Sequence, residues 1–324
     1  MQLNILITHV SYQASVSFIK MLRACKGYNI HICGCSKIEK GYTCGSMLVD
    51  KFFVVPHSNE EEYLDQIKNI CEEEKISLIL TAEEQDLIIF KTHKVPEALY
   101  QYIPDIDLFS LFQDKYLATT AINHLGVKTP KILFKASECE NINYFIRRKR
   151  VSCASRGIKM YRQNELSFNE PLFCEDYITQ PVIAGDEYTV DVFCDKNGRP
   201  IMIMPRIRLA TKDGTTVRCI IKNDTEIINV CKKIYKNYKL PGISNIQFIK
   251  QGNDVYFIEL NPRAAAACIS TLRATGINWM ELYINAFLNN QPLNSLAYYQ
   301  KKIHWNTVIS RYYEETVMFG ESNE

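Results

Sequence analysis

The stretch from 245 to 263 constrains the fold of this chain more than any other segment. Two runs of alternating polar and apolar residues flank Gly252-Asn253-Asp254. Alternate side chains of a strand lie on one face, so Glu259 and Asn261 are expected to point the same way. A three-residue turn at 252–254, where Gly and Asn tolerate positive φ, would place Gln247 opposite Glu259. The pattern predicts a β-hairpin with one polar face.

In this hairpin Phe257 is expected on the polar face with Glu259, while Ile258 and Leu260 face the core. A carboxylate and two amide oxygens, from Glu259, Gln247 and Asn261, form a hard-oxygen set that suits Mg²⁺ and leaves ligand positions for phosphates. The hairpin alone leaves a second interpretation open, which is a half-buried hairpin with an ordinary polar outer face.

The residues that follow the hairpin add to the chemical interpretation. Pro262 lacks the N–H that a strand ladder needs, so it is expected to end the strand. Arg263 comes next, and its planar guanidinium can bind a phosphate or a carboxylate through two hydrogen bonds.

Composition limits the classes of protein that fit. The chain has 324 residues, 47% of them hydrophobic and 23% charged, which is ordinary for a folded protein of two domains or one large α/β unit. A net charge of +2 gives no reason to expect nucleic acid or a membrane surface as partner. We find no signal peptide and no apolar run near the roughly 20 residues of a membrane span, so we expect a cytoplasmic protein.

The 12 cysteines are scattered along the chain. The nearest pair, Cys33 and Cys35, has one residue between them, whereas zinc motifs usually have two to four. Most of the others lie in apolar runs, where a free thiol packs as a small hydrophobic group. We therefore expect reduced structural cysteines.

The first hundred or so residues alternate strands with helices, a pattern that predicts a parallel sheet. The connection from His9 to Ser15 contains no glycine, so a dinucleotide-binding turn is not expected. The acidic residues Glu83, Glu84 and Asp86 either line a cleft or cap the next helix, and we favour the cap. The expected strands are 3–8, 29–35, 52–55 and 77–81, and the expected helices are 15–24 and 60–74.

From Asp114 onward the pattern changes. A helix over 114–125 is expected to end at Gly126. After it we predict a mixed sheet with flanking helices. The expected strands are 144–148, 157–161, 172–178, 187–194, 200–206 and 217–221, and the expected helices are 225–238 and 278–288.

Two further segments have features of a nucleotide site. The run from Arg147 to Gly157 combines basic and small residues, which fits a mobile loop over phosphates or a solvated basic face. Glu187 shares a strand face with Thr189 and Asp191, so it either binds ribose hydroxyls or faces solvent. Both alternatives stay open for each segment.

Taken in order, these segments resemble the ATP-grasp superfamily and, within it, the large chain of carbamoyl-phosphate synthase. The resemblance runs from about Asp114 to Asn289 and is carried by 114–115, 148–157, 175–178, 185–191, 245–247 and 259–263. It implies an α/β chain in three parts. These are a Rossmann-like pre-ATP-grasp domain over 1–110, a small β-rich lid over 111–180, and a central mixed-sheet subdomain over 181–324.

The resemblance also implies a role for each matching residue, with ATP and Mg²⁺ as cofactors. Lys115 and Arg148 would contact phosphates, Arg156 would belong to the loop that covers them, and Arg263 would stabilise the transferring phosphoryl group. The segment Glu175-Asp176-Tyr177-Ile178 would bind adenine, Glu187 would bind ribose, and Gln247, Glu259 and Asn261 would hold Mg²⁺.

Three features depart from the family pattern. Ser152 and Ala154 stand where relatives often have Gly, so closure of the loop is open to doubt. The stretches 131–145 and 162–171 are short, which implies a trimmed lid. A single grasp unit is present, whereas carbamoyl-phosphate synthase uses two.

From this resemblance we expect an ATP-dependent ligase that joins a small-molecule carboxylate to an amine through an acyl phosphate. Arg206 and Arg208 lie two apart on a strand and would either bind an acidic substrate or pair with nearby carboxylates. Asp191 and His304 are candidates for a general base. The alternatives are a non-catalytic nucleotide-binding subunit and a kinase on the same fold. A homodimer is one expectation for the assembly.

Overall fold

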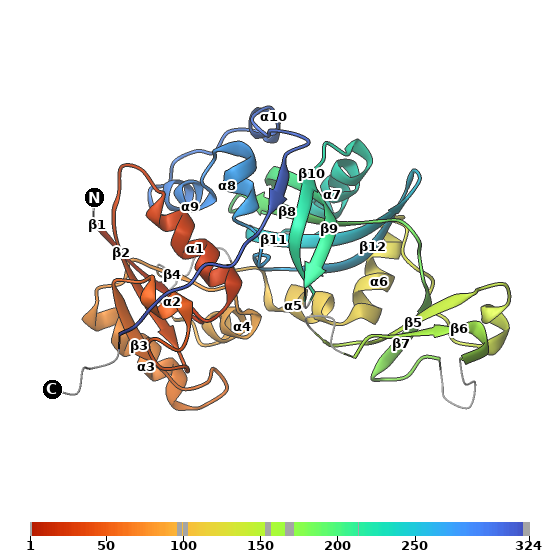
Figure 1. The fold of residues 1–324 in the computed structure, drawn as a ribbon, viewed down its shortest axis with the longest axis horizontal. Helices are drawn as coiled ribbons and strands as arrows, with labels where there is room; N and C mark the ends of the chain where they lie inside the picture. The colour runs from red at the N-terminus through yellow and green to blue at the C-terminus, as the bar shows by residue number, and fades with distance from the viewer. Residues whose placement is uncertain are drawn as a thin grey trace.

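The computed structural model describes residues 2–95, 99, 103–152, 157–165, 172–212 and 214–319. It contains three sheets arranged along the longest axis of the molecule (Figure 1). The N-terminal sheet lies at one end, a three-stranded sheet lies at the other, and a six-stranded sheet lies between them.

The N-terminal sheet is parallel and has the strand order β3-β2-β1-β4. Helices connect its strands because parallel neighbours require crossover connections. Residues on one face of β1, such as Ile5, pack against α1, and Leu6 on the other face packs against α3. The elements are β1 (Gln2–Ile7), α1 (Gln13–Arg23), β2 (Asn29–Ser36), α2 (Cys44–Met47), β3 (Lys51–Val54), α3 (Glu62–Glu73), β4 (Leu78–Leu80) and α4 (Glu84–Thr92).

The central sheet has the order β12-β11-β8-β9-β10-β13, and every neighbouring pair in it is antiparallel. The mixed sheet that the sequence predicted for this region is therefore not observed. The strands are β8 (Asp186–Cys194), β9 (Pro200–Lys212), β10 (Thr215–Ile221), β11 (Gly242–Gln251), β12 (Asp254–Asn261) and β13 (Val308–Ser310).

The two faces of the central sheet differ in polarity. Val190 and Val192 of β8 lie in a core with α5 (Ile106–Gln113), α6 (Lys115–His124) and α7 (Thr225–Asn237). The alternate residues of β8 face the other way, because side chains along a strand alternate between the two faces of a sheet.

The small sheet has the order β6-β5-β7 and is antiparallel. It comprises β5 (Tyr144–Lys149), β6 (Lys159–Arg162) and β7 (Tyr177–Pro181), with short 3₁₀ turns at Ala136–Cys139 and Gln163–Glu165. A strand over 172–178 was predicted, but the strand begins at Tyr177. Cys174 N–H donates to the Tyr177 carbonyl and forms a turn before it.

Segments after β12 return to the N-terminal domain. Trp279 and Met280 pack in one core with Ile5 and Phe18. The single helix predicted over 278–288 is instead α9 (Trp279–Tyr283) followed by a π-helical turn (Ile284–Leu288). The remaining elements are α8 (Ser270–Thr275) and α10 (Leu296–Gln300).

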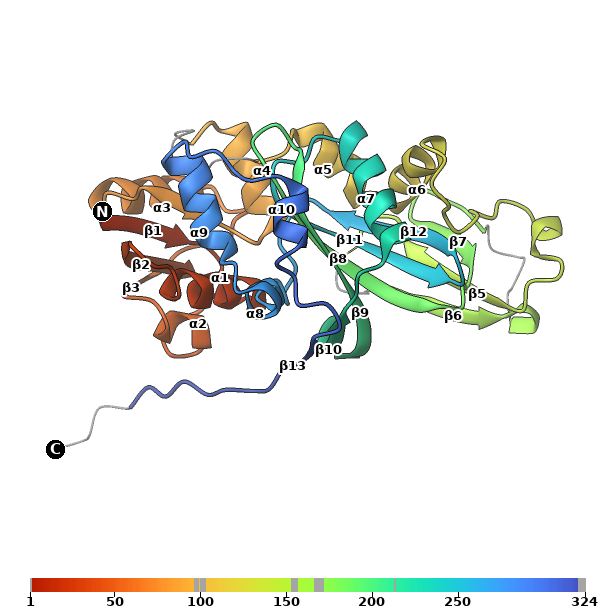
Figure 2. The same ribbon diagram turned by 90° about the horizontal axis from the view of Figure 1, so that it is seen from above.

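The C-terminal tail runs from β13 back along the N-terminal domain (Figure 2). Glu314 forms a 2.6 Å ion pair with Lys20 of α1. Met318 lies against Gly41, so closely that a Cβ at that position would lie 2.3 Å from the Met318 methyl carbon. Within the described residues, no helix is long and apolar enough to span a bilayer.

The expected α/β architecture, a parallel N-terminal sheet followed by an ATP-grasp unit, is confirmed. The core that the N-terminal domain shares with β8 and α9 contains several aromatic rings. Phe193 of β8 is fully buried and stacks on Trp279 with ring centroids 5.6 Å apart, and the ring of Phe287 meets it edge-on at 6.1 Å.

Replacing this ring should therefore destabilise the whole chain. We expect Phe193→Ala to lower the free energy of unfolding by about 3–5 kcal/mol, since it removes buried apolar surface and leaves a cavity. Tyr42→Ala, at a position that is 78% exposed, should change it by less than about 0.5 kcal/mol. Urea unfolding monitored by circular dichroism would measure the free energy of unfolding of both variants. Equal effects would contradict the packing role of Phe193.

Candidate active site

The hairpin of β11 and β12 brings the predicted metal ligands together. Gln247 pairs with Glu259 across the two strands, and Asn245 pairs with Asn261. The opposition of Gln247 and Glu259 is the one that the sequence predicted.

The turn and the strand that produce this register differ from the prediction. Gln251 pairs with Asp254, so the turn contains two residues, and the extra residue is Ile258, a bulge between Phe257 and Glu259. A bulge reverses the alternation of the strand that carries it. Phe257 therefore lies in the core beside Phe248, with the rings 6.4 Å apart, and not on the polar face with Glu259.

The register continues as a polar row across the central sheet. Glu259 of β12, Gln247 of β11, Thr189 of β8 and Arg206 of β9 are successive partners on four adjacent strands. Side chains at paired positions lie on the same face. A parallel row is formed by Asn261, Asn245, Asp191 and Met204.

The side chain of Asn261 is oriented by its neighbours. Its Nδ2 donates to Glu259 Oε1 at 3.0 Å and to Asn245 Oδ1 at 3.3 Å. Asn245 in turn donates to the Arg263 carbonyl at 2.9 Å. The amide nitrogen of Asn261 is thus used inside the protein, which leaves its carbonyl oxygen available for a cation. With Gln247 and Glu259, this donor set fits Mg²⁺.

Arg148 of β5 is buried and is the cation that faces this carboxylate. One of its terminal nitrogens donates to Gln180 Oε1 at 2.7 Å, and Gln180 donates to the Pro130 carbonyl at 2.9 Å. Burial lowers the pKa of the Arg148 guanidinium, and the charge of Glu259 opposes that shift. Its Nε is buried and meets no acceptor in the described part of the chain. Such a cation is suited to a phosphate oxygen.

Lys115 begins α6 and contacts the start of the basic loop. Its Nζ donates to the carbonyl and the hydroxyl of Ser152, at 2.9 and 3.1 Å. Asp114 caps α6 and pairs with Arg150. Burial raises the pKa of the Asp114 carboxyl, but hydrogen bonds from Arg150 and from backbone N–H groups hold it below its ordinary value. Arg156 lies outside the described residues.

The segment 175–178 leads into β7 of the small sheet, which begins at Tyr177. The side chains of Glu175 and Asp176 are exposed, Tyr177 is half-buried and Ile178 is buried on β7. The Asp176 carbonyl accepts from Arg150 N–H at 2.8 Å. The predicted adenine contacts are not tested by these positions and stay a proposal.

The two arginines predicted for substrate are both paired with carboxylates. Arg206 bonds to Asp191 at 2.8 and 3.3 Å, and both side chains are 1% exposed. Arg208 bonds to Glu187 and, at 2.7 Å, to the Gly214 carbonyl. Of the two interpretations offered by the sequence, pairing with nearby carboxylates is the one observed.

The same two ion pairs also engage two other residues that the sequence indicated as candidates for the site. Glu187 is engaged by Arg208, and Asp191, a candidate general base, is engaged by Arg206. The other candidate base, His304, is exposed beyond α10.

Arg206 keeps one unused donor. Its Nη1 is buried without an acceptor in the described part of the chain. Arg311 lies nearby and donates to Gln13 at 3.2 Å. Burial and the charge of Arg206 lower the pKa of the Arg311 guanidinium. The two guanidiniums form an electropositive spot beside the polar row. No local pattern in the sequence indicates Arg311, since it lies about a hundred residues beyond Arg206.

Arg263 follows β12 and meets a carboxylate from the N-terminal domain. Its Nε lies 3.8 Å from Glu84 Oε2 at the start of α4. Burial raises the pKa of the Glu84 carboxyl, Arg263 lowers it in part, and the charge of Glu259 raises it further. Glu83 caps α4 as predicted, whereas Glu84 contacts Arg263 at the end of the hairpin.

Comparisons with known proteins agree with this geometry. The family model described as "ATP-grasp in the biosynthetic pathway with Ter operon" matches residues 173–309, and the model "PylC-like, N-terminal domain" matches residues 5–99. This chain is a member of the ATP-grasp superfamily. Its N-terminal domain is PylC-like.

Curated relatives of this ATP-grasp protein match over shorter stretches. The carbamoyl phosphate synthase large chain of Helicobacter pylori is 28% identical over 145 residues, 43% of this chain and 13% of the relative. The corresponding protein of Thermoplasma volcanium is 32% identical over 82 residues, which are 24% of this chain. This chain therefore spans a small part of these relatives, and their similarity is distant.

Solved structures match nearly the whole fold. The biotin carboxylase domain of the Hydrogenobacter thermophilus 2-oxoglutarate carboxylase, a dimer in complex with MgADP, ADP and bicarbonate, has a TM-score of 0.70 at 16% identity. It aligns with 94% of this chain and 73% of its own. N5-Carboxyaminoimidazole synthetase from Staphylococcus aureus, complexed with ADP, has a TM-score of 0.69 at 14% identity and covers 91% of this chain and 80% of its own.

The buried pair of Asp191 and Arg206 leads to a stability prediction. Asp191→Ala leaves Arg206 buried without its counter-ion, so we expect the free energy of unfolding to fall by about 3–5 kcal/mol. The double variant Asp191→Ala/Arg206→Met removes both charges and should recover much of this loss. Glu314→Ala, which breaks an exposed pair with Lys20, should leave the free energy of unfolding nearly unchanged. A double variant no more stable than Asp191→Ala would contradict this interpretation.

Proposed function

We propose that this ATP-grasp protein is a Mg²⁺-dependent ligase that joins a carboxylate to an amine through an acyl phosphate. The observation that carries the proposal is the set of charges around Glu259. Gln247 lies opposite this carboxylate, and Asn261 lies beside it. Arg148 approaches from the small sheet. Glu84, which contacts Arg263, approaches from the N-terminal domain.

The arrangement supports a division of labour typical of phosphoryl transfer, in which positioning and charge neutralisation dominate. Gln247, Glu259 and Asn261 would hold Mg²⁺, which would supply positive charge to neutralise the ATP phosphates. Arg148 and Lys115 would bind phosphate oxygens from the small sheet and from α6. We propose that 175–178 contacts adenine and that Glu187 contacts ribose, as family resemblance implies.

The carboxylate substrate needs activation because its anion is a poor electrophile. We propose that it lies at the end of the polar row, where Arg206 Nη1 and Arg311 offer positive charge. Arg263 would stabilise the negative charge of the group in transfer. The small sheet would exclude water, which would otherwise hydrolyse the acyl phosphate.

We also propose a homodimer, because the similar biotin carboxylase domain is described as a dimer. Sedimentation of the full chain would decide this point. A monomer at micromolar concentration would contradict it.

One assay distinguishes the ligase from its alternatives. The protein is incubated with ATP, Mg²⁺, hydroxylamine and pools of amino acids, dicarboxylates or sugar acids, and phosphate and hydroxamate are measured. A ligase gives ADP, phosphate and a hydroxamate, because hydroxylamine intercepts the acyl phosphate. A kinase gives ADP and a stable phosphorylated product, and a nucleotide-binding subunit gives neither.

The metal assignment leads to a separate prediction. Glu259→Ala should lower Mg²⁺-dependent ATP turnover by about 10³-fold or more, because a bound metal contributes several kcal/mol to stabilisation of the transferring phosphate. Asp254→Asn is the matched control, since it changes a carboxylate at the tip of the same hairpin and should keep full turnover. Substantial turnover by a correctly folded Glu259→Ala protein would refute the assignment.

A further inference from the structure

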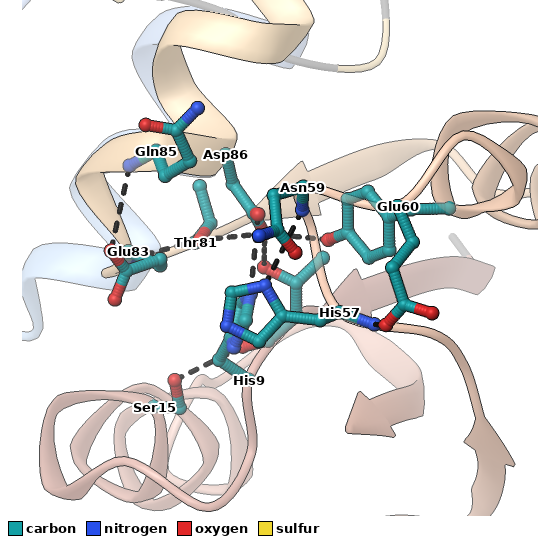
Figure 3. Close-up of polar contacts among 11 residues, drawn as sticks. His9, Ser15, His57, Asn59, Glu60, Thr81, Glu83, Gln85 and Asp86 are labelled. Atoms are coloured by element: carbon teal, nitrogen blue, oxygen red, sulfur yellow. Dashed lines mark hydrogen bonds and ion pairs between the residues drawn. The ribbon is translucent and has the colours of Figure 1, made fainter. Parts of the chain in front are cut away.

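The N-terminal domain holds a second polar cluster, built around the carboxylate of Asp86 (Figure 3). Asp86 is fully buried in the first turn of α4. Its Oδ2 accepts from Thr8 Oγ1 at 2.6 Å, from the Tyr63 hydroxyl at 2.7 Å and from Thr81 Oγ1 at 3.4 Å. Its Oδ1 lies 3.2 Å from His9 Nε2.

These contacts fix the charge and the direction of the His9 ring. A buried carboxylate persists only when donors compensate for the water it has lost, and three hydroxyl groups do so for Asp86. An ionised carboxylate accepts hydrogen bonds, so Nε2 of His9 carries the proton. The lone pair of a neutral imidazole is then on Nδ1, which has no hydrogen-bond partner in the described part of the chain.

The backbone holds His9 in an uncommon conformation. Its φ is +49°, in the left-handed region that residues other than glycine rarely adopt. Tyr12 stacks on the imidazole with ring centroids 5.2 Å apart, and the side chain stays 12% exposed. A constrained residue at the carboxyl end of a parallel strand is a frequent feature of ligand sites.

The cluster is connected to the proposed active site. Glu83, whose charge acts on His9, precedes Glu84, whose carboxylate lies 3.8 Å from Arg263. Thr81, a donor to Asp86, lines a small cavity of about 60 Å³ together with Arg263 and Pro262 at the end of the hairpin. Thr81 thus lies between the Asp86 cluster and the end of the hairpin, and this is the connection from His9 to the proposed site.

We propose that His9 accepts the proton of the amine substrate, with Asp86 as the residue that positions its ring. This inference rests on the proposed ligase function, and it assigns the amine, a primary ammonium at neutral pH, to the carboxyl ends of β1 and β4.

The step conserves atoms and charge. The ammonium first gives one proton to His9 Nδ1, which frees the electron pair of the nitrogen. The nitrogen then bonds to the acyl carbon, and the bond from that carbon to the phosphate oxygen breaks, with its electron pair going to the phosphate. The second proton that the nitrogen loses goes to the departing phosphate, which leaves as hydrogen phosphate. Asp86 stabilises the imidazolium that forms, without itself taking the proton.

The pH dependence follows from the charges around His9. Burial lowers the pKa of His9, but the hydrogen bond and charge of Asp86 and the charge of Glu83 raise it above 6.5, against a smaller opposing effect of Lys37. Tyr12 and Tyr63 are the other titratable groups that pack on the ring. Since the neutral ring is the active form, amide formation should fall as the pH drops through this raised pKa.

The decisive experiment compares two small nucleophiles with the full-length protein. Hydroxylamine is largely unprotonated at neutral pH and needs no base, whereas ammonium must lose a proton before it can react. The carboxylate is the one that gives the most hydroxamate in the screen described above. Ammonium chloride and the twenty common amino acids serve as amine probes.

We expect His9→Gln to keep hydroxamate formation and to lower amide formation by about 10²–10⁴-fold, the usual range for loss of a general base. The acid limb of the pH profile should disappear in this variant. His57→Gln is the matched control. His57 is drawn beside the cluster in Figure 3, but its ring accepts from the Asn59 N–H and its backbone N–H donates to Glu60, so its hydrogen bonds in the described part of the chain are local. This variant should keep both activities.

A second measurement tests the ring without turnover. Nitrogen-15 spectra of histidine-labelled protein should show the Nε2–H tautomer for His9 and a pKa above 6.5, and Asp86→Asn should lower that pKa. A tautomer protonated at Nδ1 would overturn the proposal.

The remaining outcomes separate the two proposals. Unchanged amide formation in His9→Gln, or an equal loss of amide and hydroxamate, would refute the role of His9 and leave the ligase intact. Hydroxamate formation without amide formation from any of the amine probes would also contradict the role of His9. Failure of the unaltered protein to form any hydroxamate would refute the ligase, and the role of His9 with it.

Discussion

The bulge at Ile258 is the constraint on which the polar face of the central sheet depends. Without it, the alternation of β12 would put Phe257 beside Glu259 and expose an aromatic ring that now packs on Phe248. One extra residue in one strand lets the tip of the hairpin bury its aromatic rings while the base presents oxygen donors. The same short strand therefore supplies an aromatic ring to the core and oxygen donors to the polar face.

Buried charged groups occur in both the central sheet and the N-terminal domain. Asp191 with Arg206 in the central sheet, and Asp86 with its hydroxyl partners in the N-terminal domain, are withdrawn from water. Removing water from an ion is costly, so each group is held in one orientation by its partners. That rigidity leaves one defined nitrogen without a partner among the described residues in each case, the buried Nη1 of Arg206 and Nδ1 of His9.

The sequence predicted most of the elements, because their hydrophobic periodicities are strong. It predicted the pairing of Gln247 with Glu259 for an incorrect reason, since a three-residue turn and a two-residue turn with a bulge give the same register beyond the bulge. It could not predict that Glu84 meets Arg263, because this contact joins residues about 180 positions apart. No local pattern indicates a role for His9 either, because His9 follows β1 and its partner Asp86 lies in α4.

The tail from Arg311 to Phe319 has a mechanical consequence. It anchors the last strand of the central sheet to the first domain through Glu314 with Lys20 and through Met318 against Gly41. A hinge that swung those two parts open would have to detach this strap, in addition to the shared aromatic core.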